Sequence, residues 1–249
     1  QMVKERRNFW LEFDIRNHFK LGPVKYHNVV ASIKGTKYPD EYVIISGHLD
    51  SYDVATGGID CGTGIGPMME AARMIALSGA KPKRTILFVA FAGEEFGLLG
   101  AKAYVKTHAK ELGKIANLFN RDGGPTPPVG ISVPQAMYDD FVEVCKPVKE
   151  IRADYPFEVK VAKPFKRPTQ SGGTDASVFA VEGVPTFGFN TQDIKGYNFS
   201  YGEIWHTERD LYTKNIPEYQ EHAATVTAVV ALGIANLSKQ LSREGMHKK

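Results

Sequence analysis

Residues 42–50 read YVIISGHLD, an apolar run that passes through two small residues to His48 and Asp50. Such a short apolar run, bounded by polar residues, is typical of a strand buried on both faces of a sheet. Two later segments have the same form and also end in carboxylates, TILFVAFAGEE at 85–95 and IANLFNRD at 115–122. Ligands of an open α/β sheet bind beyond the carboxyl ends of its strands. The sequence therefore predicts an imidazole and several carboxylates at one sheet edge.

The remaining sequence alternates between further strands and helical patterns. Apolar residues recur at helical spacing over residues 64–78, 98–112, 137–148, 174–181 and 217–241. Residues 157–161 and 185–189 read as further strands. This alternation predicts an α/β fold with a mixed, largely parallel central sheet and helices on both faces. Residues 9–19 (FWLEFDIRNHF) also alternate like a strand, although no partner strand lies nearby in the sequence.

The bulk composition is that of an ordinary globular protein. Of the 249 residues, 43% are hydrophobic and 24% charged, which suffices for one large core. The net charge is only +3 and the basic residues are scattered, so we expect no nucleic-acid-binding surface. No apolar run is long enough to span a membrane, and residues 1–10 are charged. We therefore expect neither a spanning helix nor a signal peptide in this sequence.

Each polar residue at the predicted sheet edge has an ordinary structural explanation when taken alone. A histidine after a strand is usually a hydrogen-bonded structural residue, and an acidic pair such as Glu94 and Glu95 before a helix is favoured by the helix dipole. Asp122, within RDGG, suits a turn. If all of these explanations held at once, the site would be energetically unfavourable, because unpaired carboxylates that converge repel one another and are costly to desolvate. A bound cation removes that conflict.

The type and number of these side chains indicate the metal. Histidine and carboxylate ligands without a thiolate fit zinc in a catalytic site, with manganese or cobalt as substitutes. One metal needs only three protein ligands, whereas the sequence offers five or six, which favours a two-metal arrangement that shares a carboxylate and a water. A spare glutamate near that water is suited to act as general base.

Five segments carry a resemblance to a known family. They are HLDSYD at 48–53, GGID at 57–60, FAGEEFGLLG at 91–100, Asp122, and WHT at 205–207. In order and rough spacing they resemble peptidase family M28, the co-catalytic zinc peptidases, from about residue 25 to 215. Within that family, HLDSYDVATGGID is similar to the carboxypeptidase Q branch.

The resemblance implies a set of metal ligands. His48 and Asp122 are expected to hold one zinc ion, Glu95 and His206 the other, and Asp60 is expected to bridge the two. The implied activity is that of an exopeptidase, an aminopeptidase or a dipeptidase, in which a zinc-bridging hydroxide cleaves a terminal peptide bond of a peptide or dipeptide.

The resemblance also implies roles for residues outside the ligand set. Glu94 is the expected general base. Asp50 lies two residues after His48, on the same face of an extended chain, and is expected to orient the imidazole. Asp175 matches a late acidic position of the family, which we interpret as a residue behind the ligands or facing the substrate.

One residue departs from the family pattern. The family usually places aspartate or asparagine after the bridging aspartate, and here Cys61 stands in that position. We interpret this thiol as a neutral variant, with oxidation or soft metal ligation as open alternatives. Cys61 and Cys145 are too few for a disulfide framework and are not spaced as a thiolate zinc site.

Members of the branch carry a protease-associated domain inserted before the catalytic core. The resemblance therefore implies that residues 1–22 are a strand or linker leaving such an insert, and that residues 23–249 form the catalytic domain. It also implies a location outside the cytoplasm and allows a homodimer.

Two alternatives stay open at this point. Glutaminyl cyclase, a zinc acyltransferase on a similar fold, also ends its site with Trp-His-Thr, but it works with one zinc and does not need both His48 and Asp122. A non-catalytic binding module on the same fold normally has broken ligand positions, which this sequence does not. The loop at 192–203 contributes Tyr197, Phe199 and Tyr201, aromatic residues suited to line a pocket or to pack.

Overall fold

The computed structural model describes residues 1–18, 20 and 22–248. Its centre is a five-stranded sheet in the order β1-β3-β2-β4-β8. These strands are β1 (Val29–Ile33), β2 (Tyr38–His48), β3 (Arg84–Phe91), β4 (Ile115–Asn120) and β8 (Thr186–Phe187). Strands β2, β3, β4 and β8 run parallel, while β1 pairs antiparallel with β3. The predicted mixed, largely parallel sheet is confirmed.

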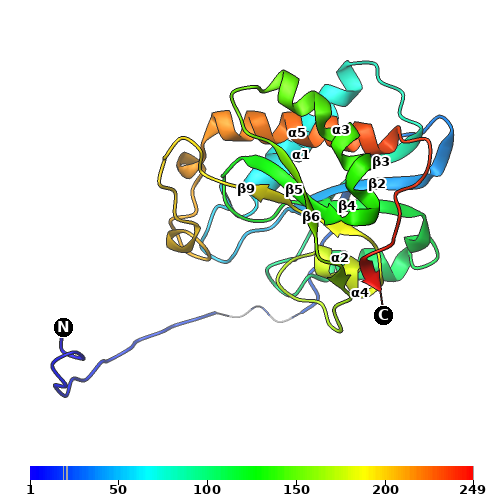
Figure 1. The fold of residues 1–249 in the computed structure, drawn as a ribbon. Helices are drawn as coiled ribbons and strands as arrows, with labels where there is room; N and C mark the ends of the chain where they lie inside the picture. Colours follow the sequence, from blue (N-terminus) through cyan, green and yellow to red (C-terminus); the bar gives the residue numbers. More distant parts are fainter. Residues whose placement is uncertain (19, 21, 249) are drawn as a thin grey trace.

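Helices cover both faces of this sheet, as predicted. One face carries α1 (Gly62–Leu77), α3 (Tyr138–Ile151) and α5 (Pro217–Ala235), and the opposite face carries α2 (Leu99–Thr107) and α4 (Ala176–Val181) (Figure 1). Each side has its own apolar core: one cluster joins the first three helices to the sheet, and a second joins α2 and α4 to it. Strand residues such as Ile44 and Leu118 are completely buried because helices lie above and below them.

A second, smaller sheet extends the structure. Its three strands lie in the order β6-β5-β9, namely β6 (Glu158–Ala162), β5 (Pro128–Pro134) and β9 (Phe189–Thr191). Strand β5 is parallel to β6 and antiparallel to β9. A two-stranded pair joins β7 (Phe165–Lys166) to β10 (Met246–Lys248). Short 3-10 helices occupy Leu112–Lys114, Gln135–Met137, Tyr201–Glu203 and Tyr212–Lys214.

Residues 9–19 are the segment that the sequence leaves open as a strand or a linker. Residues 9–18 form neither helix nor strand, and the side chain of Trp10 is 96% exposed. Phe19 lies outside the described residues. Figure 1 shows this segment running away from the sheet. Alternation of apolar and polar residues is not sufficient for a strand, because a ladder also needs a partner.

Two helices end earlier than their patterns predict. The helix predicted to residue 112 ends at Thr107, where the chain turns before the next 3-10 helix. The helix predicted to residue 241 ends at Ala235. There the Lys83 ammonium donates to the Asn236 carbonyl oxygen at 2.8 Å and the Arg84 guanidinium donates to the Leu237 carbonyl oxygen at 2.7 Å. The backbone N–H of Asn236 closes the helix on carbonyl oxygens of its last turn, and the two side chains bind the carbonyl groups that follow.

Candidate metal centre

The carboxyl ends of β2, β3 and β4 bring the predicted site residues together. His48 is the last residue of β2, and Glu94 and Glu95 follow β3. Asp122 lies two residues after β4, and Asp60 lies two residues before α1. Because these strands are parallel neighbours, their ends meet at one edge, as the sequence predicts.

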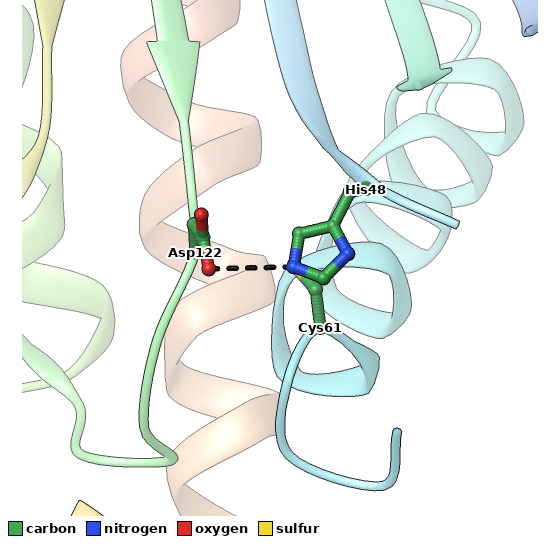
Figure 2. Close-up of side chains that lie close together, drawn as sticks. All are labelled: His48, Cys61 and Asp122. Atoms are coloured by element: carbon green, nitrogen blue, oxygen red, sulfur yellow. Dashed lines mark ion pairs between the residues drawn. The ribbon is translucent and has the colours of Figure 1, made fainter. Parts of the chain in front are cut away.

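His48 is the centre of the first group of side chains. Its imidazole is buried, and Nε2 lies 2.9 Å from Asp60 Oδ1 and 3.4 Å from Asp122 Oδ1. Figure 2 shows the imidazole facing Asp122, with Cys61 beside it. Burial alone lowers the pKa of His48, but hydrogen bonds with Asp122 and Asp60 outweigh burial and hold this pKa far above its usual value. The imidazole nitrogen therefore occupies a strongly negative environment.

The second group joins residues from opposite parts of the chain. Glu95 Oε2 lies 2.8 Å from His206 Nε2, and His206 has a positive φ of 57°. The Tyr52 ring stacks on the His206 imidazole at 4.1 Å between centroids. One donor atom each from His48, Asp60 and Glu95 lie within 4.8 Å of one another, so the two groups adjoin.

The donor set fits a divalent cation. Glu95 Oε1 is buried and has no hydrogen-bond partner among the described residues. Burial and then the charge of Asp60 raise the pKa of Glu95. Burying a carboxylate oxygen without a partner costs free energy, and a metal ion bound to that oxygen offsets the cost. The site combines imidazole nitrogens and carboxylate oxygens, which are ligands that zinc accepts.

Glu94 lines the same cleft but belongs to neither of the two groups of side chains described above. Its side chain is buried, and burial and then the charge of Asp122 raise its pKa to about 8. A carboxylate whose pKa is displaced toward neutrality is suited to take up and release a proton.

The carboxylate of Asp50 does not orient the His48 imidazole as expected. Its backbone carbonyl oxygen lies 2.9 Å from His48 Nδ1, whereas its carboxylate is 3.9 Å from that nitrogen. The two carboxylate oxygens instead accept hydrogen bonds from the backbone N–H groups of Glu94 and Glu95, at 3.1 and 3.2 Å. The backbone of Asp50 thus contacts the imidazole, and its side chain holds the loop after β3.

Asp175 is buried at the start of α4. Both carboxylate oxygens lack a hydrogen-bond partner among the described residues, and burial raises its pKa to about 7. The charges of His48, Asp122 and Asp50 also act on this carboxyl group. Its neighbours in the chain, Thr174 and Ala176, line the candidate cleft.

Two further residues complete the site. The Tyr201 hydroxyl donates a 2.7 Å hydrogen bond to Asp60 Oδ2. Asp210 is buried, and its carboxylate accepts hydrogen bonds from the backbone N–H groups of Ile59 at 2.6 Å and of Asp60 at 3.1 Å. The sequence marks Tyr201 only as one of several aromatic loop residues. Nothing in the sequence distinguishes Asp210 from an ordinary acidic loop residue.

Cys61 is enclosed below the site. Its thiol donates to the Arg121 carbonyl oxygen at 3.1 Å, and burial raises its pKa. Gly64 makes this packing possible, because a Cβ atom there would lie 2.4 Å from Cys61 Sγ and 2.2 Å from the Arg121 oxygen. The Sγ atom also lies within 4.8 Å of donor atoms of His48 and Asp122.

A cleft of about 770 Å³ opens over these residues. Its lining includes Asp60, Glu94, Glu95, Asp122 and His206, together with Lys102, Tyr201 and Trp205 and a glycine-rich stretch at 171–173. Four of the five predicted ligands and Glu94 therefore line a cleft that a small molecule could enter, whereas His48 is buried and is not part of the lining. Among the described residues, no helix is both long and apolar enough to cross a membrane.

Comparisons with known sequences identify a family. A model of peptidase family M28 matches residues 28–230. Carboxypeptidase Q of Rattus norvegicus is 32% identical over 231 residues, which cover 91% of this chain and 46% of that protein. A probable zinc metalloprotease of Pyrenophora teres f. teres (strain 0-1) is 37% identical over 123 residues, which cover 46% of this chain and 26% of that protein. The chain spans about half the length of the carboxypeptidase Q relatives it matches.

Solved structures of similar fold include members of the same family. A peptidase M28 precursor from Shewanella amazonensis SB2B superposes with a TM-score of 0.72 at 34% identity, covering 86% of this chain and 46% of that one. BSAP, a zinc aminopeptidase from Bacillus subtilis, shares the fold with a TM-score of 0.64 at 21% identity, covering 89% of this chain and 53% of that one. The resemblance found in the sequence motifs is confirmed: the chain belongs to peptidase family M28.

Proposed function

We propose that this chain is a zinc exopeptidase with two metal ions. His48 and Asp122 would hold one zinc ion, Glu95 and His206 the other, and Asp60 would contact both. The observation that carries the proposal is the convergence of these side chains: four of them line one cleft together with Glu94, and the buried His48 lies within 3.4 Å of Asp60 and Asp122. The family membership and the names of the relatives support zinc as the metal.

Zinc, when bound, polarises a carbonyl group and lowers the pKa of water. Glu94 then accepts a proton from the water that attacks the scissile carbonyl carbon. A carbon–oxygen bond forms, the carbon–nitrogen bond breaks, and Glu94 delivers the proton to the departing amine. The loop that positions Glu94 is held by Asp50, whose carboxylate binds the backbone N–H of Glu94.

The substrate class follows from the family and from the cleft. One relative is named a carboxypeptidase and another fold neighbour a zinc aminopeptidase, so removal of a terminal residue is the shared activity that we propose for this chain. A cleft of about 770 Å³ has the size typical of small-ligand sites. The location outside the cytoplasm, the homodimer and the division at residue 22 remain predictions from the family resemblance.

The test combines metal analysis with a substrate panel. The purified chain is loaded with zinc, dialysed and analysed for zinc per chain, then assayed with dipeptides and aminoacyl reporters with and without a chelator. We expect two zinc ions per chain and chelator-sensitive release of amino acids. One zinc with cyclisation of an amino-terminal glutamine would favour the cyclase alternative, and no turnover with two bound zinc ions would favour a non-catalytic module.

A further inference from the structure

Tyr219 and Asp193 fasten one end of the segment that connects β9 to α5. This connecting segment, residues 192–216, carries Tyr201 and His206 into the candidate metal centre. The Tyr219 hydroxyl donates a 2.6 Å hydrogen bond to Asp193 Oδ1. Tyr219 is fully buried in the first turn of α5, a helix that contributes to the apolar core. The bond therefore ties the connecting segment to a rigid part of the fold.

The chain turns sharply at Asp193, and the same bond holds that turn. Asp193 Oδ1 also accepts a 3.1 Å hydrogen bond from the backbone N–H of Gly196, and Oδ2 accepts one of 2.8 Å from that of Asn198. The backbone N–H of Lys195 donates to the Tyr219 hydroxyl oxygen at 2.9 Å. The hydroxyl is thus both donor and acceptor to one turn, whose own hydrogen bonds close on the carboxylate that Tyr219 binds.

Two further side chains of the turn also reach α5, but at its surface. The Lys195 ammonium and the Tyr197 hydroxyl both donate to the carboxylate of Glu218. Exposed contacts of this kind contribute little, because water competes for them. A hydrogen bond from a buried hydroxyl to a carboxylate is stronger. The bond between Tyr219 and Asp193 is therefore the main attachment of the turn to the helix.

Beyond the turn, the connecting segment contacts the candidate metal centre. The Tyr201 hydroxyl donates to Asp60 Oδ2 at 2.7 Å. The rings of Phe199 and Tyr201 lie against Gly124, where a Cβ atom would be 3.3 Å and 3.5 Å from them. Gly124 follows Asp122 by two residues. A shift of this part of the connecting segment would therefore change the surroundings of Asp60 and of the loop that carries Asp122.

His206 depends on the connecting segment for its position. Its φ is 57°, and its side chain is 30% exposed. A residue other than glycine keeps a positive φ only where surrounding contacts hold it. We propose that the hydrogen bond between Tyr219 and Asp193 positions His206 and Tyr201 for metal binding. Tyr219 contacts neither ligand directly, so it is a positioning residue that acts through the connecting segment.

This inference rests on the proposed two-zinc site and adds a residue that positions part of it. The experiment compares Tyr219→Phe with Tyr155→Phe in the zinc-loaded full chain. Tyr155 is buried beside the same end of α5, but its hydroxyl lies 3.5 Å from two oxygens of Glu218, at the limit of a hydrogen bond. Both variants lose one hydroxyl from a buried tyrosine, so Tyr155→Phe is the matched control for a general effect on packing.

The first readout is the rate at which zinc is lost to a competing chelator, followed as zinc per chain by mass spectrometry. We expect Tyr219→Phe to lose one of its two zinc ions about tenfold faster than the unmodified chain, because a charge-assisted hydrogen bond is removed. Tyr155→Phe should lose zinc at the unmodified rate. Adding Asp193→Asn to Tyr219→Phe should change the rate little more, because both substitutions weaken the same bond. A role in folding alone would lower the stability of the zinc-free chain and leave this rate unchanged.

The second readout needs no zinc. Trp205 precedes His206, and its ring lies 4.2 Å from the imidazole between centroids. The chain has two tryptophans, so in a Trp10→Phe background the fluorescence comes from Trp205 alone. We expect acrylamide to quench this fluorescence more strongly in Tyr219→Phe than in Tyr155→Phe, because a segment released from α5 opens more often.

Equal zinc loss in Tyr219→Phe and in the unmodified chain would overturn the inference, as would equal quenching of Trp205 in Tyr219→Phe and Tyr155→Phe. If the unmodified chain holds fewer than two zinc ions, the proposed two-zinc site fails instead. The quenching of Trp205 then still decides whether Tyr219 holds the connecting segment in place.

Discussion

Asp60 Oδ2 accepts a hydrogen bond of 2.7 Å from the hydroxyl of Tyr201, a residue 141 positions later in the chain. Asp60 is the carboxylate that would contact both metal ions. Its Oδ1 already faces His48, so the tyrosine holds the second oxygen. A proton on the tyrosine is required for this bond, and burial followed by the hydrogen bond to Asp60 keeps the pKa of Tyr201 far above its usual value.

Removal of that hydroxyl is expected to impair the metal centre. In Tyr201→Phe the ring remains, but Asp60 loses a charge-assisted hydrogen bond, which typically contributes about 1.5–3 kcal/mol. We expect kcat/KM to fall by about tenfold or more, with weaker retention of zinc against a competing chelator. Tyr212→Phe is the control, because Tyr212 is 77% exposed. Equal activity and zinc retention in Tyr201→Phe and in the unmodified chain would contradict this role.

The general base is tested by Glu94→Gln. The amide has nearly the same shape but does not accept a proton, so we expect kcat to fall by about 10²- to 10⁴-fold. Zinc content measured by mass spectrometry is expected to stay at the unmodified level, because the proposal gives no ligand role to Glu94. Glu143→Gln, exposed on α3, controls for the general effect of losing a carboxylate. Ordinary turnover in Glu94→Gln would refute the assignment.

Asp210 is expected to support both folding and metal binding. In Asp210→Asn one of the two backbone N–H groups, of Ile59 or of Asp60, loses its acceptor and meets an amide N–H₂ instead. A buried unsatisfied donor costs about 1–3 kcal/mol. Urea unfolding should show a loss of this size, and zinc binding should weaken because Asp60 shifts. The exposed Asp40→Asn should change neither quantity. Asp210→Asn with unchanged stability would show that this contact is dispensable.

The sequence was sufficient for the centre of the sheet and for the polar residues at its edge. Strands β2, β3 and β4 are buried on both faces, so their apolar runs are continuous and their ends are visible in the sequence. Strand β1 was missed because its residues are mostly exposed, and β5 because proline stands at both of its ends.

Contacts between residues that are distant in the chain could not be predicted from the sequence. The hydrogen bonds of Asp210 to Ile59 and Asp60 span about 150 positions, and no local pattern marks an acidic loop residue as a backbone acceptor. Lys102 likewise belongs to an exposed helix surface by its pattern, and only the fold places it on the cleft. Periodicity reports which face of an element is buried, but it carries no information about which loops meet.

His222 is expected to make stability depend on pH. Its imidazole is fully buried on α5, where Nε2 donates to the Pro128 carbonyl oxygen at 2.8 Å and Nδ1 has no described partner. Burial lowers the pKa of His222 to about 4. Between about pH 6.5 and pH 4 the unfolded chain binds a proton here that the folded protein does not, so acidification through this window removes stability.

The size of this effect is on the order of 3 kcal/mol, because one pKa unit corresponds to about 1.4 kcal/mol. The free energy of unfolding in urea is measured from pH 7 to pH 4 for the unmodified chain and for His222→Gln. The difference between the two free energies is then compared across this pH range. We expect the unmodified chain to lose more stability than the variant as the pH falls. Parallel curves would mean that the imidazole is protonated equally in both states.

The anchoring of Asp60 by Asp210 also has a consequence for the order of events during synthesis. His48 and Asp60 leave the ribosome long before Asp210, and until then the backbone around Ile59 lacks its acceptor. The nascent chain consequently carries His48 and Asp60, two of the proposed ligands, without the residue that holds the backbone of Asp60. On the proposed ligand set, we therefore expect tight metal binding only in chains whose last third has already folded against the first.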